Sequence, residues 1–214
     1  MGQAVKDGKA TWWCDTEIVW MKGHEIELSD LFASLTNLQY QALLDGRAHV
    51  VFTGGEPCLA ENTAYAKMFL EHFMEHHSSK RLFTEVETNA TLHSWLIDTA
   101  DQINCSPKLS NSGMPRAQRI RPDVLMHLFN LWAHDGKKVQ FKFVVSNEED
   151  VKEMFAAYID PGYVSIKQVV LMPGVDRRDD LAERTRFVWE VAQKLGVRMC
   201  SRLHILAFDK TVGV

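Results

Sequence analysis

Short runs of β-branched and aromatic residues alternate along the chain with longer segments of helical periodicity. This alternation is typical of β–α units built around a mainly parallel sheet. The apolar runs predict six strands, at residues 49–53, 82–87, 102–105, 139–145, 165–171 and 198–205. The periodic segments predict helices at residues 29–44, 62–76, 92–99, 122–134, 148–158 and 179–194. Ser29 and Asn147 are expected as N-caps of the first and fifth helices.

Six β–α repeats are too few for a closed eight-stranded barrel, but they suit an open or partial one. We therefore expect an α/β fold of the partial (βα)6 TIM-barrel type, with residues 1–214 forming one domain. In such folds the chemistry gathers at the carboxyl ends of the strands. The polar stretch 106–122 contains Gly and Pro and is expected as one long loop, and loops of that length tend to be functional or mobile.

Composition narrows the class of protein. The chain is 46% hydrophobic and 24% charged, with a formal net charge of −4, which is not the electrostatic footprint of a nucleic-acid binder. The longest apolar runs, such as residues 164–173, fall far short of the roughly 18 residues of a membrane span. The N-terminus has no apolar run of signal-peptide length, so we expect a cytoplasmic protein without nucleic-acid or membrane partners. Its cysteines are then thiols or ligands rather than a disulfide framework: Cys14, Cys58, Cys105 and Cys200.

Two glycines and a carboxylate leave the end of the first predicted strand together. Residues 49–53 lead directly into Gly54, Gly55, Glu56 and Pro57. Glycines at such a point let a ligand approach the backbone closely, and Glu56 can accept hydrogen bonds from an ammonium group. For a lone Gly-Gly pair, an ordinary strand-to-helix turn is the alternative explanation.

Polar residues also follow the later strands. Their recurrence at several strand ends is stronger evidence for a site than any single one of them. These residues are Glu87, Thr88 and Asn89, then Ser106, Pro107 and Lys108, then Lys142 and Ser146, followed by the segment LMPG. Because the carboxyl ends of parallel strands meet at one rim, these groups are expected to converge there. Each of them alone would equally suit a helix N-cap or a solvated loop.

The string FTGGEPCL resembles the motif with which radical S-adenosylmethionine enzymes hold the methionine amino group. It is preceded by CDT and followed in order by VETNAT, NCSPKLS, FKFVVS, LMPG and RLHI. This ordered set is similar to the 7-carboxy-7-deazaguanine synthase family, also described as organic radical activating enzymes. The resemblance runs from about Trp13 to the C-terminus, and the combination is far more specific than GGEP alone.

The resemblance implies a carbon–nitrogen lyase of queuosine and 7-deazapurine biosynthesis. In that family a 4Fe-4S cluster reduces S-adenosylmethionine to a 5′-deoxyadenosyl radical. The radical takes a hydrogen from 6-carboxy-5,6,7,8-tetrahydropterin, whose ring then contracts. The cofactor carries the hard chemistry, and the protein supplies binding and orientation. Magnesium, an external electron donor such as flavodoxin, and a homodimer are also implied.

Individual site residues follow from the same resemblance. Gly54, Gly55 and Glu56 are implied to bind the methionine part of S-adenosylmethionine. The rest of the cofactor is assigned to Thr88, Asn89, Ser106 and Ser146, the substrate pocket to Lys108 and His204, iron to Cys14 and magnesium to Thr16. An oxygen donor such as the Thr16 hydroxyl suits a hard cation. A histidine near a strand end is also often a structural group, and for His204 both roles stay open.

The cysteine motif departs from the family. A cluster that binds S-adenosylmethionine needs three cysteine thiolates and one open iron. The family places the last two cysteines three positions apart, just before Asp-Thr. Cys14 matches the last of them, but Thr11 stands at the preceding position and no cysteine comes earlier. We expect a shortened first strand and cluster loop, from a deletion, a different start or a natural remnant, and no activity in the chain as given.

Two further groups offer alternative metal ligands. Cys58, Cys105 and Cys200 lie at three different strand ends without the local spacing of a cluster loop, so packing is the favoured role. His72, Glu75 and His76 form HxxEH, the spacing of an inverted zinc-protease motif. That segment ends a predicted helix, where histidines suit the negative end of the helix dipole, and the sequence offers no evident third ligand.

Three functions remain in competition. The first is a deazaguanine synthase with an incomplete N-terminus, and the second is a non-catalytic domain that keeps a pocket for S-adenosylmethionine or a pterin. The third is an activase for a glycyl radical enzyme, which shares the cofactor motif. The CDT and RLHI signatures favour the synthase over the activase.

Overall fold

The computed structural model describes residue 10, residues 25–209 and residue 211. Its centre is a parallel sheet of six strands in the order β1-β2-β3-β4-β5-β6. The strands are β1 (Val50–Phe52), β2 (Thr84–Thr88), β3 (Gln102–Cys105), β4 (Lys138–Val145), β5 (Val169–Pro173) and β6 (Arg198–Met199). Strands that pair in chain order wind in one direction, as in a barrel, whereas a doubly wound sheet reverses its order. The predicted partial barrel is confirmed.

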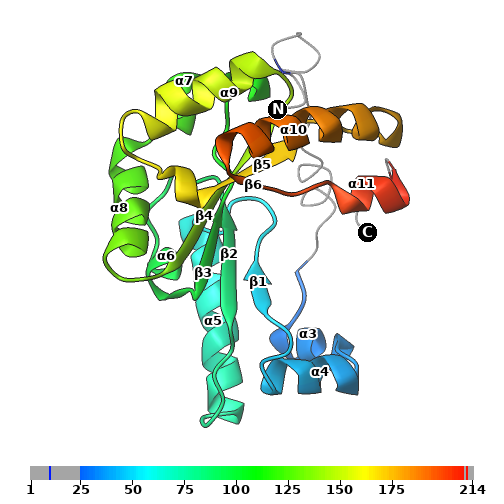
Figure 1. Cartoon of the computed structure of the whole chain (residues 1–214). Coiled ribbons are helices and arrows are strands. Elements are labelled where there is room, and N and C mark those ends of the chain that lie inside the picture. The colour runs from blue at the N-terminus through cyan, green and yellow to red at the C-terminus, as the bar shows by residue number, and fades with distance from the viewer. Residues whose placement is uncertain (1–9, 11–24, 210, 212–214) are drawn as a thin grey trace.

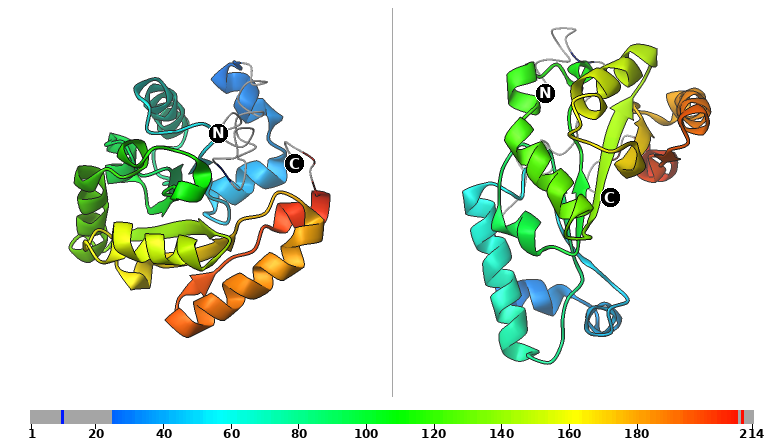
Figure 2. Two further views of the ribbon diagram at one scale, coloured as in Figure 1. Left: turned by 90° about the horizontal axis from the view of Figure 1, so that it is seen from above. Right: turned by 60° about the vertical axis from the view of Figure 1, so that its left-hand side comes forward.

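Helices connect the strands. They are α3 (Leu28–Ser34), α4 (Asn37–Leu44), α5 (Ala60–His76), α6 (Trp95–Thr99), α7 (Arg116–Arg119), α8 (Pro122–Ala133), α9 (Glu148–Met154), α10 (Leu181–Leu195) and α11 (Leu203–Phe208). Seen from above, α5, α8, α9 and α10 follow one another around the outer side of the curved sheet (Figure 2). Within the described residues, no helix has both the length and the apolar character needed to cross a membrane.

The two faces of the sheet differ because side chains alternate along each strand. In β4, Phe141 and Phe143 are fully buried under the helices, while Gln140 and Lys142 on the opposite face are half-buried. Burying a large apolar side chain contributes about 1.5–3 kcal/mol, so the alternation fixes which face the helices cover. The opposite, polar face lies on the inside of the curve. It therefore provides a polar surface directly below the rim.

The predicted first helix is wrong, because two helices occupy its place. Thr36 interrupts it, accepting a hydrogen bond from the Gln39 amide while the Gln39 side chain accepts from the Thr36 amide. This capping box starts α4 afresh. Ser29 is not the N-cap, since α3 begins at Leu28 after Glu27. Asn147 is confirmed as an N-cap, with its side chain accepting from the Asp150 amide at 3.0 Å.

Four other segments differ from the prediction. Residues 165–168 form a 3-10 turn, η3 (Ile166–Gln168), closed by a Ser165–Gln168 capping box, so β5 starts only at Val169. The last predicted strand stops at Met199, and its second half is helix α11. The fifth predicted helix continues past α9 as a π-helical turn, η2 (Phe155–Ile159). The stretch 106–122 contains two short helices, η1 (Ser110–Ser112) and α7, rather than one continuous loop.

Candidate functional site

The turn after β1 leaves open space at the rim. Gly54 has a φ of +97°, a left-handed conformation that residues other than glycine rarely adopt. Among the described residues, a Cβ atom built on Gly54 or on Gly55 would meet no atom within 4 Å apart from those of its chain neighbours. A cleft of about 840 Å³ borders this turn between α3, β1 and α5, and Gly55 and Glu56 are among its lining residues. Its volume is that of a small-molecule pocket.

Glu56 joins the ends of β1 and β2. One carboxylate oxygen accepts hydrogen bonds from the Thr88 hydroxyl at 2.7 Å and from the Cys58 amide at 3.1 Å. The other oxygen accepts from the Asn89 amide at 2.8 Å. A carboxylate has about four acceptor positions, so one remains for a further donor. The structure thus brings together three of the predicted cofactor residues, and it holds the Glu56 side chain in one orientation.

The remaining two predicted cofactor residues follow the neighbouring strands. The Ser106 amide donates to the Thr88 carbonyl at 2.7 Å, which fixes the end of β3 beside β2. Ser146 follows β4, and its amide donates to the Asp150 carboxylate at 2.7 Å while its carbonyl accepts from Arg184 at 2.8 Å. Four adjacent strands therefore present the predicted residues along one rim.

An ion pair lies on the polar face below this rim. Lys142 from β4 donates to the Glu87 carboxylate of β2 at 2.8 Å, and Thr53 donates to the other Glu87 oxygen at 3.2 Å. The Lys142 side chain is 19% exposed and that of Glu87 40%. The sequence showed both residues near strand ends, but only the tertiary structure pairs them. They place one positive and one negative group beside the Glu56 network.

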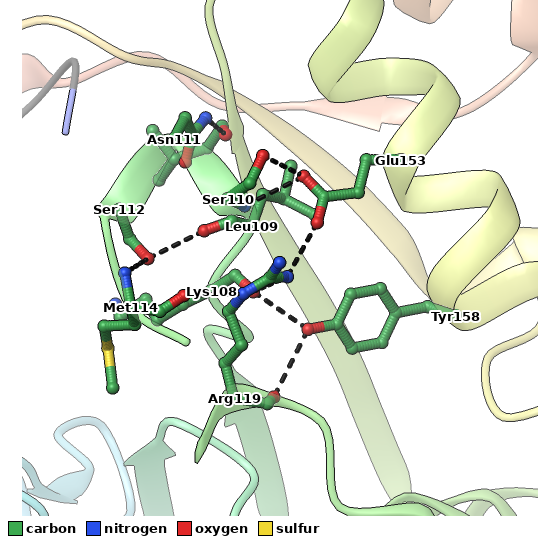
Figure 3. Close-up of polar contacts among 10 residues, drawn as sticks. Lys108, Leu109, Ser110, Asn111, Ser112, Met114, Arg119, Glu153 and Tyr158 are labelled. Atoms are coloured by element: carbon green, nitrogen blue, oxygen red, sulfur yellow. Dashed lines mark hydrogen bonds and ion pairs between the residues drawn. The ribbon is translucent and has the colours of Figure 1, made fainter. Parts of the chain in front are cut away.

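A buried polar network fixes the backbone at Lys108 (Figure 3). The Lys108 carbonyl accepts from the Tyr158 hydroxyl at 2.9 Å and from the Arg119 guanidinium at 3.2 Å. Arg119, whose side chain is 6% exposed, pairs with Glu153 at 2.7 Å. The Glu153 carboxylate also accepts from the amide and hydroxyl of Ser110, at 2.8 and 2.6 Å. Sequence reasoning gave no role to Arg119, Glu153 or Tyr158, because these contacts join residues far apart in the chain.

Comparison with known proteins shows what the chain is similar to. No family model matches the chain. It is 29% identical over 206 residues to a 7-carboxy-7-deazaguanine synthase from Pyrobaculum aerophilum, covering 94% of this chain and 82% of that protein. It is 26% identical over 221 residues to a protein of the same name from Halobacterium salinarum, covering 92% and 78%. The chain is a relative of the 7-carboxy-7-deazaguanine synthases. The relationship predicted from the sequence motifs is confirmed.

Among solved structures, QueE from Escherichia coli is similar to this chain with a TM-score of 0.49 and 19% sequence identity. The match covers 91% of this chain and 80% of that one. The order and direction of the six strands, rather than this match, carry the assignment of the fold.

Three free thiols lie among the described residues, those of Cys58, Cys105 and Cys200. Burial raises the pKa of Cys58 to about 12, with the nearby Glu56 charge adding to the effect. Burial also raises the pKa of Cys105 well above its usual range, and that of Cys200 to a lesser degree. Cys58 and Cys105 are also buried members of the hydrophobic core, which suits a packing role. Cys14 and Thr16 lie outside the described residues.

His204 follows β6, whereas the other described residues that the sequence assigned to the site follow β1 to β4. It is exposed on α11, on the β6 side of the sheet, and not on a strand as expected. Arg202 donates to the Val175 carbonyl at 2.6 Å, and Ile205 packs with Val175 and Leu181. These contacts fasten α11 to the segment that follows β5. His204 therefore lies on the β5–β6 side of the sheet, while Glu56 lies on its β1–β2 side.

Proposed function

We propose that this chain is a 7-carboxy-7-deazaguanine synthase of the radical S-adenosylmethionine type, a carbon–nitrogen lyase that acts on 6-carboxy-5,6,7,8-tetrahydropterin. The observation that carries the proposal is the Glu56–Thr88–Asn89 network at a glycine turn, in a chain similar to two synthases over more than nine-tenths of its length. The same similarity favours the synthase over a glycyl-radical activase.

In this proposal the rim binds S-adenosylmethionine. Gly54 and Gly55 let the methionine part approach the backbone, and Glu56 accepts from its ammonium group. Thr88, Asn89, Ser106 and Ser146 line the remaining cofactor site. When bound, S-adenosylmethionine is the source of the radical that this enzyme type uses. The protein's contribution is a carboxylate already held by three donors, so little side-chain entropy is lost when the ligand binds.

The pterin site is proposed along the same rim and on the polar face below it. Lys108 and His204 supply hydrogen-bond donors for the carboxylate and ring of the substrate. The Lys142–Glu87 pair adds a further donor and acceptor on the polar face. A heterocycle with polar edges and a carboxylate is bound by fixed groups of both kinds.

The proposal treats the iron–sulfur cluster and the magnesium ion differently. Cys14 is the one cysteine that matches the cluster motif, and Cys58 and Cys105 are buried in the hydrophobic core, so we derive no step through the cluster. Thr16 is proposed as a magnesium ligand. A flavodoxin-type electron donor and a homodimer are proposed from the resemblance alone.

Calorimetric titration with S-adenosylmethionine tests the proposed cofactor site. Glu56→Gln keeps the size of the side chain but removes its charge, and a charge-assisted hydrogen bond contributes about 1.5–3 kcal/mol. We expect a Kd raised about tenfold to a hundredfold. Glu190→Gln, which neutralises an exposed carboxylate on α10, is the matched control and should bind as the unmodified protein does. Equal affinities for Glu56→Gln and the control would refute the role of Glu56.

A further inference from the structure

The last turn of α5 carries a group of side chains of the metal-ligand type. His72, Glu75 and His76 each offer one ligand atom, and these atoms all lie within 4.8 Å of one another. The group is separate from the rim, since α5 starts at Ala60 and runs roughly 25 Å away from it, at 1.5 Å per residue. Figure 1 shows this end of α5 near α3 and α4.

The spacing places all three side chains on one side of the helix. Residues four apart, such as His72 and His76, are neighbours on a helical face, and Glu75 lies three residues after His72. The sequence named all three residues as an HxxEH motif, and the structure shows that the ligand atom of Glu75 lies as close as those of the two histidines. The position at the helix end also matters, because the carbonyl end of the helix dipole attracts positive charge.

The imidazole rings are already oriented. His76 Nδ1 lies 2.8 Å from the His72 carbonyl oxygen, a contact in which Nδ1 donates its proton. The Nε2 atom of His76 then carries the lone pair, which is the form that binds a metal. The His72 ring stacks on Phe32 of α3, with centroids 5.2 Å apart, and lies 4.4 Å from the His76 ring. One ring is thus fixed by a hydrogen bond and the other by packing.

We propose that His72, Glu75 and His76 bind one divalent transition-metal ion of the zinc type, with water completing a tetrahedral shell. Zinc takes imidazole nitrogen and carboxylate oxygen at about 2.0–2.2 Å, which sets neighbouring ligand atoms about 3.3–3.6 Å apart. Glu75 is exposed, and its side chain can rotate to close this distance while His76 keeps its hydrogen bond. The ion would fix the end of α5 and, through the His72–Phe32 contact, the position of α3.

The site is independent of the proposed synthase activity and of its magnesium. Two imidazoles select zinc, cobalt, nickel or copper ions, whereas magnesium prefers an all-oxygen shell. It is also not a protease site in this proposal, because the ligands lie on the outer surface at a helix end. Its effect is on stability.

Metal titration of the chelator-treated full chain tests the proposal, using zinc by calorimetry and cobalt by absorption spectroscopy. We expect one ion per chain at this site, with cobalt d–d bands that lack a sulfur charge-transfer band. His76→Ala should weaken binding at least tenfold and abolish the zinc-induced rise in melting temperature. Glu75→Gln, which preserves size, should weaken it less. His134→Ala, an exposed histidine at the end of α8, is the matched control and should bind as the unmodified protein does.

Each other result counts against the site. Equal zinc affinity and equal thermal shift in the unmodified protein and His76→Ala would overturn it, even if both proteins bind metal. A cobalt spectrum with a sulfur charge-transfer band that persists in His76→Ala would place the ion on cysteine instead. Binding that did not weaken on acidification would also contradict imidazole ligands, because protons compete for the same nitrogens.

Discussion

Two carboxylates, Glu56 and Glu153, each join two segments near the rim through hydrogen bonds. Glu56 bridges the glycine turn to Thr88 and Asn89, and Glu153 bridges the Ser110 turn to Arg119. A buried ion pair with satisfied hydrogen bonds is costly to break, because removing one partner leaves the other charge uncompensated. Glu153 therefore anchors the Ser110 turn, and protonation of its carboxylate would weaken that anchor.

Glu153 should make stability depend on acidity. Burial raises the pKa of its carboxyl, but hydrogen bonds from Ser110 and the charge of Arg119 outweigh this, so the net pKa lies below the ordinary value of 4.5. A depressed pKa stabilises the folded state above the unfolded value, and the stabilisation is lost as the pH falls through the folded value. We expect the free energy of unfolding, measured in urea, to fall as the pH drops below about 4.5.

The Glu153→Gln variant identifies the source of that dependence. It should be less stable at neutral pH and should lose stability less steeply in acid. Glu190→Gln should keep the slope of the unmodified chain, since Glu190 is exposed on α10. An identical acid slope in all three proteins would mean that other groups dominate.

At the scale of elements, the ends of β4 and β5 can pair only because their backbones approach closely at Gly174. Gly174 follows β5, and its amide donates to the Val145 carbonyl of β4 at 3.0 Å. A Cβ atom at this position would lie 2.2 Å from the Ser146 hydroxyl oxygen and 3.3 Å from a Val144 methyl group. The absence of a side chain at Gly174 is therefore what lets the ends of β4 and β5 meet beside Ser146.

Gly174→Ala should push the Ser146 hydroxyl aside and destabilise the protein by about 1–3 kcal/mol, the usual cost of overpacking. The double variant Gly174→Ala/Ser146→Ala removes the 2.2 Å contact and leaves the Val144 methyl group at 3.3 Å and the position-146 Cβ at 3.6 Å. We expect it to be more stable than the sum of the single changes predicts, by at least about 1 kcal/mol in urea unfolding. Simple additivity would show that the clash is not the cause.

At the scale of the whole molecule, the described sheet is an open arc rather than a closed barrel. Within the described residues, β1 pairs with β2 and β6 with β5, and the core lies between the sheet and its outer helices. The predicted cofactor residues occupy the β1–β4 part of the rim, and α11 carries His204 on the β5–β6 side. A ligand that contacts both groups has to span the inner face of the arc.

Iron content should distinguish a loaded enzyme from a binding domain. One matched cysteine cannot supply three thiolates, so anaerobic reconstitution of these 214 residues should yield far fewer than four irons per chain. Thr11→Cys together with a family-type segment carrying the remaining cysteine should restore the cluster. Stoichiometric 5′-deoxyadenosine formation by the chain as given, under reducing conditions, would contradict this prediction.

The sequence by itself determined the fold class, the order of the strands and the rim on which the motifs lie. It could do so because side-chain alternation and strand-end glycines are local signals. Only the tertiary structure decided that Glu56 meets Thr88, 32 positions away, or that Tyr158 holds the Lys108 carbonyl, 50 positions away. It also decided that residues 203–208 form a helix, where the apolar run suggested strand. Contacts between distant segments, such as the packing of α11 on the β5 side, do not alter the local periodicity of apolar and polar residues. They therefore cannot be predicted from that periodicity.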